Sequence, residues 1–136
     1  MWLVPASFVS AVAAGAVFGM AGVAVPFVEI GIAASIIVFG LLLASGRDMT
    51  LPLTMVLAGC FALFHGHAHG TEAAGFDISG IGYVAGLLIS TALLHAFGVL
   101  LALAACRRLE VASKPLLQWS GGLVALAGVG VLAGWI

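Results

Sequence analysis

Three of the four histidines in this chain of 136 residues fall within five positions, at His65, His67 and His69. Glu72 follows three residues after the last of them. Imidazole and carboxylate groups together suit borderline divalent ions such as nickel, cobalt, zinc and copper, whereas sites that select softer metals use thiolates. Charged residues make up only 7% of the chain. The cluster therefore predicts a metal-binding site.

The backbone conformation decides which of these side chains share a face. In an α-helix, residues four and seven apart lie on one face, so His65, His69 and Glu72 align while His67 points away by about 160°. If the glycines between the histidines instead loosen the segment into extended backbone, the three imidazoles share a side through the period of two. Both conformations gather imidazoles, and the sequence leaves both open.

Three ionisable residues outside the cluster are further candidates. Glu29 and Asp77 could complete a ligand shell, although a helix dipole accounts for Glu29 and helix capping for Asp77 as well. His95 lies about 16 Å from the end of its own apolar segment, on a stripe with Thr91 and Gly98. A histidine at such depth indicates either a hydrogen bond to a neighbouring helix or a second station on an ion path.

Composition decides what kind of fold positions these residues. Hydrophobic residues make up 64% of the chain and the mean hydropathy is +1.33, values that predict an all-α polytopic membrane protein. The net charge of −1 and the lack of a basic cluster argue against nucleic acid as a partner. Short connections between the apolar segments favour one integral-membrane domain in the lipid bilayer. The expected membrane helices cover residues 3–23, 27–45, 50–70, 79–106 and 115–136.

The third segment is too short without its histidines. Leu51 to Phe64 is 14 residues, or about 21 Å of helix, against a hydrocarbon core of about 30 Å. For the segment to cross, the helix must continue through the histidines. Small residues at four-residue spacing predict close helix packing. They are Ala11, Gly15 and Gly19; Gly31 and Ser35; Gly82, Gly86 and Ser90; and Gly130 and Gly134.

Positive charges predict the orientation. Arg47 separates the second and third segments, and Arg107, Arg108 and Lys114 separate the fourth and fifth. Residues 71–78 contain no Lys or Arg. Because Lys and Arg in short loops stay on the cytoplasmic side, we expect a cytoplasmic N-terminus and a histidine cluster near the outer face.

The motif resembles that of a known family. Residues 61–72 (FALFHGHAHGTE), preceded by VEIGIAAS at 28–35 and followed by TALLHAFG at 91–98, are similar to the HupE/UreJ family of hydrogenase and urease accessory membrane proteins. The resemblance covers nearly the whole chain. It implies that the histidines of residues 65–69 are the family's third-helix metal motif, and that Glu29 and His95 match recurrent polar positions.

The resemblance also implies a function. It points to a secondary permease for nickel, or cobalt, in a bacterial inner membrane, without enzymatic activity or a tightly bound cofactor. Metalloenzyme maturation proteins and a second copy of the chain are the expected protein partners. The alternatives are a metal donor or sensor that does not transport, with zinc as a further candidate ion, and a structural subunit that binds no metal.

One family feature is absent. Members usually carry an earlier helix with the motif HPxxGxDH, which this sequence does not contain. Trp2 to Pro5 resembles the beginning of the family's second helix. The resemblance therefore implies a chain that begins late or a shortened member.

Overall fold

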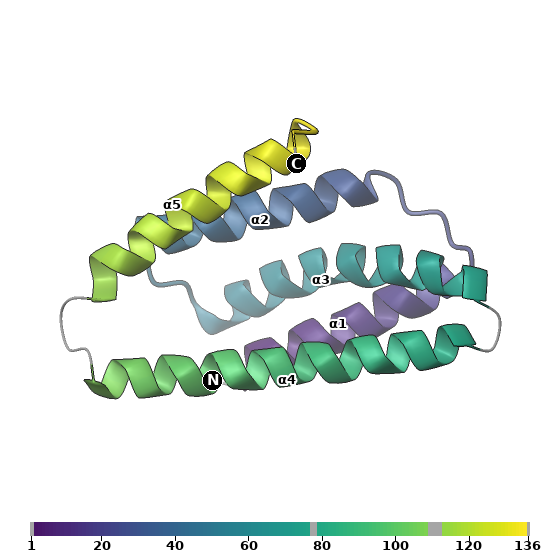
Figure 1. Ribbon diagram of the computed structural model, residues 1–136, viewed down its shortest axis with the longest axis horizontal. Helices are drawn as coiled ribbons and strands as arrows, with labels where there is room; N and C mark the ends of the chain where they lie inside the picture. The colour runs from purple at the N-terminus through teal and green to yellow at the C-terminus, as the bar shows by residue number, and fades with distance from the viewer. Residues whose placement is uncertain (1, 77–78, 109–112, 136) are drawn as a thin grey trace.

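Helices make up nearly all of the computed structural model, which describes residues 2–76, 79–108 and 113–135 (Figure 1). The helices are α1 (Leu3–Met20), α2 (Val28–Ser45), α3 (Leu51–Ala73), α4 (Ser79–Arg108) and α5 (Ser113–Leu132), with a short 3-10 helix, η1 (Ala74–Phe76), after α3. Each of α1 to α5 is long and apolar enough to cross a membrane. The predicted all-α fold with five membrane helices is confirmed.

Successive helices run in opposite directions, so the connections gather at two ends (Figure 1). Residues 21–27 and η1 lie at one end, together with the last turns of α3. Residues 46–50 lie at the other end, beside the beginning of α5. Within the bundle, α1 packs mainly against α3, and α2 mainly against α5. The expected histidine end and the expected arginine end are therefore opposite one another.

The length argument for the third helix is confirmed. α3 begins after Thr50, which is extended, with Pro52 in its first turn, where proline's missing N–H breaks no hydrogen bond. It then runs unbroken for 23 residues, about 34 Å, through all three histidines. This continuous helix excludes the extended alternative for the motif.

Glycines allow α1 and α3 to touch along their backbones. A Cβ atom added at any of four glycines would collide with a backbone carbonyl oxygen of the other helix. They are Gly15 and Gly19 on α1 and Gly66 and Gly70 on α3. In lipid, where apolar attraction favours no helix partner over the acyl chains, such close approach supplies the packing energy. The packing predicted for the first helix is present.

The same spacing does not bring α4 into close contact. No atom lies within 4 Å of a Cβ added at Gly82 or Gly86, and Ser90 is exposed. The expectation that these residues pack tightly is wrong for the helices described. Small residues at four-residue spacing make a smooth helix face, but this spacing does not determine which helix packs against that face. In the structure, α4 contacts mainly α1 and α3.

The interior is built from small side chains. The buried apolar residues in the described part of the chain are alanines and one valine: Val12, Ala16, Ala33, Ala58, Ala62, Ala73 and Ala125. The large side chains point outward; Phe27 and Leu94, for example, are at least 70% exposed. This arrangement suits a bundle surrounded by lipid, where outward apolar side chains cost nothing.

Candidate metal site

The helical motif places two pairs of residues on adjacent faces of α3. Gly66 and Gly70 lie against α1, as shown by their approach to its backbone. His65 and His69, also four residues apart, lie one position earlier along the chain on the next face. The alternation of histidine and glycine therefore separates two functions of α3. The glycines allow close packing against α1, and the histidines lie on the adjacent face.

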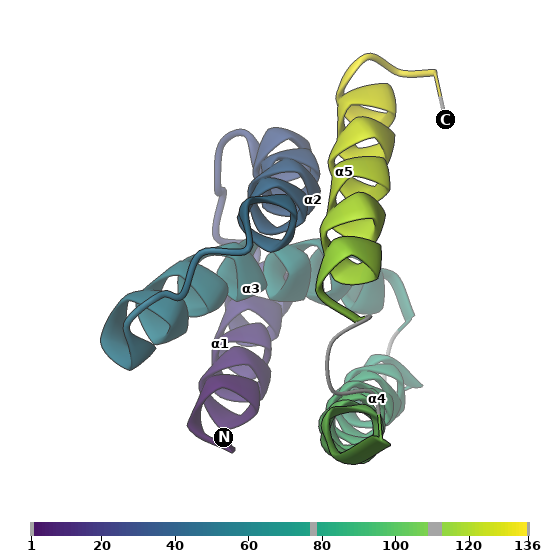
Figure 2. The same ribbon diagram turned by 90° about the vertical axis from the view of Figure 1, so that its left-hand side faces the viewer.

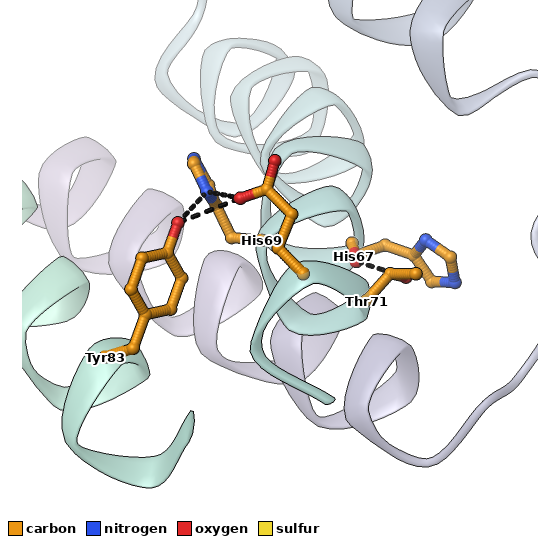
Figure 3. A network of polar contacts seen from close by, with 5 residues as sticks. His67, His69, Thr71 and Tyr83 are labelled. Carbon is orange, nitrogen blue, oxygen red and sulfur yellow. Dashed lines mark hydrogen bonds and ion pairs between the residues drawn. The ribbon is translucent and has the colours of Figure 1, made fainter. Parts of the chain in front are cut away.

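His69 belongs to a network that joins α3 to α4 (Figure 3). Its Nδ1 atom lies 2.9 Å from the Tyr83 hydroxyl oxygen and 3.2 Å from Glu72 Oε2. The Tyr83 hydroxyl donates to the same Glu72 oxygen at 2.9 Å. Tyr83 also stacks obliquely near His69, with ring centroids 6.1 Å apart. The predicted His69 and Glu72 pair is thus brought together, with a tyrosine added.

The network fixes the tautomer of His69. The hydroxyl has one proton, and that proton goes to the carboxylate. The Nδ1 atom of His69 must then carry its own proton and donate to the tyrosine and carboxylate oxygens. The lone pair of this imidazole is left on Nε2. Carboxylates that orient a histidine in this way commonly support metal ligands.

His65 is oriented by a different helix. Its Nε2 atom lies 3.1 Å from Ser35 Oγ on α2, and the Ser35 hydroxyl donates its proton to the Ile32 carbonyl at 2.6 Å. Ser35 Oγ can therefore only accept, so Nε2 of His65 donates and its lone pair lies on Nδ1. Ser35, which is 4% exposed, holds His65 as Tyr83 and Glu72 hold His69.

His67 points away from His69, as helical periodicity predicts (Figure 3). It is 9% exposed, and its Nε2 atom donates to the Val23 carbonyl oxygen at 2.7 Å. Val23 lies in the connection between α1 and α2. His67 therefore links α3 to this connection by a hydrogen bond, on a face away from His65 and His69.

His95 stands apart from the cluster, half-way along α4. Its Nδ1 atom donates to the Thr91 carbonyl at 2.8 Å, and its ring lies 4.8 Å from that of Phe8 on α1. The side chain lines a cavity of about 420 Å³ together with Trp2 and Ser10. Of the two residues predicted to share a stripe with His95, Gly98 lines a neighbouring hollow with it, and Thr91 contacts it through the backbone carbonyl.

The remaining candidates are not joined to the histidines. Glu29 is exposed in the first turn of α2, at the same end of the bundle, and no hydrogen bond or ion pair within residues 2–76, 79–108 and 113–135 links it to them. Asp77 lies outside the described residues. Across the described parts of the chain, no three His, Cys, Asp or Glu side chains gather as a metal site. What the tertiary structure does assemble is a pair of oriented imidazoles.

Tyr83 and Ser35 are the two residues that sequence reasoning missed. Tyr83 is the only tyrosine of the chain and lies in the second turn of α4, just across the short connection from Glu72. That position was a usable signal, because antiparallel neighbours joined by a short connection meet at their adjacent ends. Ser35 gave no local signal, since only the packing of α2 beside α3 brings it to His65.

Comparison with known proteins identifies the family of the chain. The family model described as HupE / UreJ protein matches residues 1–131. Protein HupE from Rhizobium leguminosarum bv. viciae is 40% identical over 134 residues, which cover 98% of this chain and 68% of that protein. No solved structure matches the chain. With its five apolar helices and a match over nearly its whole length, the chain is a multi-pass membrane protein that belongs to the HupE/UreJ family.

Proposed function

We propose that the chain transports nickel, or cobalt, across the bacterial inner membrane for hydrogenase or urease maturation. The observation that carries this proposal is the pair His65 and His69 on one face of α3, each with one ring nitrogen held by a protein acceptor and the other left with its lone pair. Paired imidazoles four residues apart on a helix are a recurrent way to hold a divalent metal. Membership of the HupE/UreJ family supports the same reading.

The proposed ligands differ from the set that the sequence offered. His65 through Nδ1 and His69 through Nε2 bind the ion, and Glu72 orients His69, since one of its oxygens is committed to the network with Tyr83. His67 holds the connection between α1 and α2. Two protein ligands leave most of the ion's shell to water. A partly hydrated ion suits transport, because a conducting site must bind well enough to fill and weakly enough to empty.

His95 is the proposed second station. It offers a single Nε2 lone pair beside a cavity of about 420 Å³, half-way along α4, whereas the histidine pair lies near the end of α3. A lone imidazole binds more weakly than two, so an ion that leaves His65 and His69 can be held there briefly. With the N-terminus cytoplasmic, as the positive charges predict, the histidine pair receives the ion from the outer face and His95 passes it inward.

Reconstitution tests the function directly. We expect liposomes that contain the purified chain to accumulate Ni²⁺, detected by a metal-quenched dye inside, faster than protein-free liposomes. Calorimetry on the same protein in detergent should show Ni²⁺ binding. Binding without flux would favour a metal donor or sensor of the maturation machinery over a permease. The absence of both would leave a structural subunit and contradict the metal site itself.

Substituting Tyr83→Phe should weaken Ni²⁺ binding about tenfold, the low end of the range for residues that orient a metal ligand. The variant keeps the ring beside His69 and removes only the hydroxyl that donates to Glu72. Calorimetry measures the change. Ser90→Ala is the matched control, because it removes an exposed hydroxyl from the same helix. Equal affinities for Tyr83→Phe and the unaltered chain would show that the network does not orient His69.

A further inference from the structure

The end of the bundle opposite the histidines contains a cavity of about 540 Å³. It lies among the end of α2, the connection of residues 46–50, and the first turns of α3 and α5. Figure 2 looks onto this end, with the end of α2 and the beginnings of α3 and α5 toward the viewer. Nothing in the proposed metal path uses this cavity, since His95 and the histidine pair lie elsewhere.

Cationic and amide groups belong to the lining of the cavity. Arg47 and Lys114 are two of the four Lys and Arg residues of the chain, and both line it together with Gln118. A guanidinium presents paired N–H groups that match phosphate oxygens, and an ammonium adds a point charge. Gly46, with a φ of 60°, leaves space for the Gln118 amide, because a Cβ there would lie 2.5 Å from its Nε2 atom.

Apolar side chains also line the cavity. Phe39, Leu42 and Leu43 project from the last turns of α2, and Leu117 from α5. A ligand that matches both parts of the lining is anionic at one end and apolar at the other. These groups lie near the ends of helices that are long and apolar enough to cross a membrane, and helix ends are where lipid headgroups are expected.

Asp48 also lines the cavity, so a cation must be considered as the ligand in place of an anion. The two basic side chains outnumber this carboxylate, so the lining keeps one net positive charge. A divalent cation would meet one carboxylate and two repelling groups. An anion meets two attracting groups and one repelling group, and Asp48 moderates its affinity.

We propose that this cavity binds the phosphate of an anionic phospholipid headgroup, with an acyl chain along the apolar wall formed by α2 and α5. Basic pockets between membrane helices recognise such headgroups, and each Lys or Arg contributes on the order of a fivefold gain in affinity. The lipid bridges α2, α3 and α5 where the helices diverge. The proposal is independent of the metal site.

Native mass spectrometry of the purified chain in detergent tests the proposal, with phosphatidylglycerol as the anionic probe and phosphatidylcholine as its zwitterionic counterpart. We expect phosphatidylglycerol to be retained about fivefold more than phosphatidylcholine. Arg47→Gln and Lys114→Gln should each lower its retention about fivefold. Both side chains are exposed, so the variants should elute and unfold as the unaltered chain does. Equal retention of the two lipids, or retention that neither substitution changes, would overturn the proposal.

Two further experiments distinguish the phospholipid from a divalent cation and from free phosphate as the ligand. Asp48→Asn should raise phosphatidylglycerol retention, whereas Glu29→Gln, the same change of charge at the far end of α2, should not. Lower retention in Asp48→Asn, together with Ni²⁺ binding that Arg47→Gln strengthens, would show a cation site and overturn the proposal. Excess inorganic phosphate should not displace the lipid; full displacement would identify free phosphate as the ligand and also overturn it.

Discussion

Replacing His65 and His69 together with alanine should reduce nickel uptake to the level of cells that lack the protein. The double variant removes both oriented lone pairs and leaves Ser35, Glu72 and Tyr83 without the imidazoles that they hold. Each single substitution should weaken Ni²⁺ binding by more than about tenfold, because losing a ligand costs at least as much as losing the residue that orients it. Uptake of radioactive nickel by expressing cells measures the effect.

His95→Ala supplies the comparison that separates binding from passage. This variant should bind Ni²⁺ in detergent with the affinity of the unaltered chain, yet transport it more slowly in liposomes, because the histidine pair is intact and only the deeper station is lost. Equal membrane amounts and equal elution volumes of all variants establish that they fold. Undiminished uptake by the His65→Ala/His69→Ala variant would remove the proposed metal site.

The second large effect concerns packing, and it does not involve metal. Gly66→Val should destabilise the bundle by about 3 kcal/mol, the upper end of the usual cost of overpacking, since its Cβ would collide with the Val12 carbonyl and no flexible side chain can yield there. α1 and α3 would have to separate along the whole of their contact. Thermal unfolding in detergent and the yield of monodisperse protein measure the loss.

Two alanine substitutions make this prediction specific. Gly15→Ala places a Cβ against the Leu63 carbonyl from the α1 side, outside the histidine motif, and should also destabilise the bundle. Gly82→Ala on α4 adds a methyl group where no atom lies within 4 Å. It should leave stability unchanged or raise it by up to about 1 kcal/mol through helix propensity. Similar stabilities for Gly15→Ala and Gly82→Ala would show that close backbone contact does not hold α1 to α3.

Together these predictions assign the histidine-glycine motif two roles. Gly66 and Gly70 pack against α1, and His65 and His69 are the proposed metal ligands. The two pairs have the same four-residue spacing. A change at a motif glycine would therefore lower metal binding indirectly, by moving the helix that carries the histidines. Separate readouts of stability and Ni²⁺ affinity distinguish the two causes.

The sequence by itself determined the five membrane helices, because crossing a hydrocarbon core requires about 20 apolar residues whatever the neighbours are. It also determined that α3 runs through the histidines, since residues 51–64 are too short to cross alone. Helical periodicity then fixed that His65 and His69 share a face and that His67 does not. All three are properties of a single segment, so no contact between helices was needed to predict them.

Only the tertiary structure decided which groups hold those imidazoles. Ser35 comes from α2 and the Val23 carbonyl from the connection after α1, 30 and 44 residues from their histidines, and Tyr83 lies on α4, 14 residues from His69. Glu72 is the exception, because it lies three residues from His69 on the same helix. It also decided that α3 packs on the glycines of α1 while Gly82 and Gly86 of α4 stay open. The physical reason is that lipid is as apolar as the helices themselves. The choice of partner therefore depends on shape complementarity and hydrogen bonds between distant segments, which hydropathy and spacing do not encode.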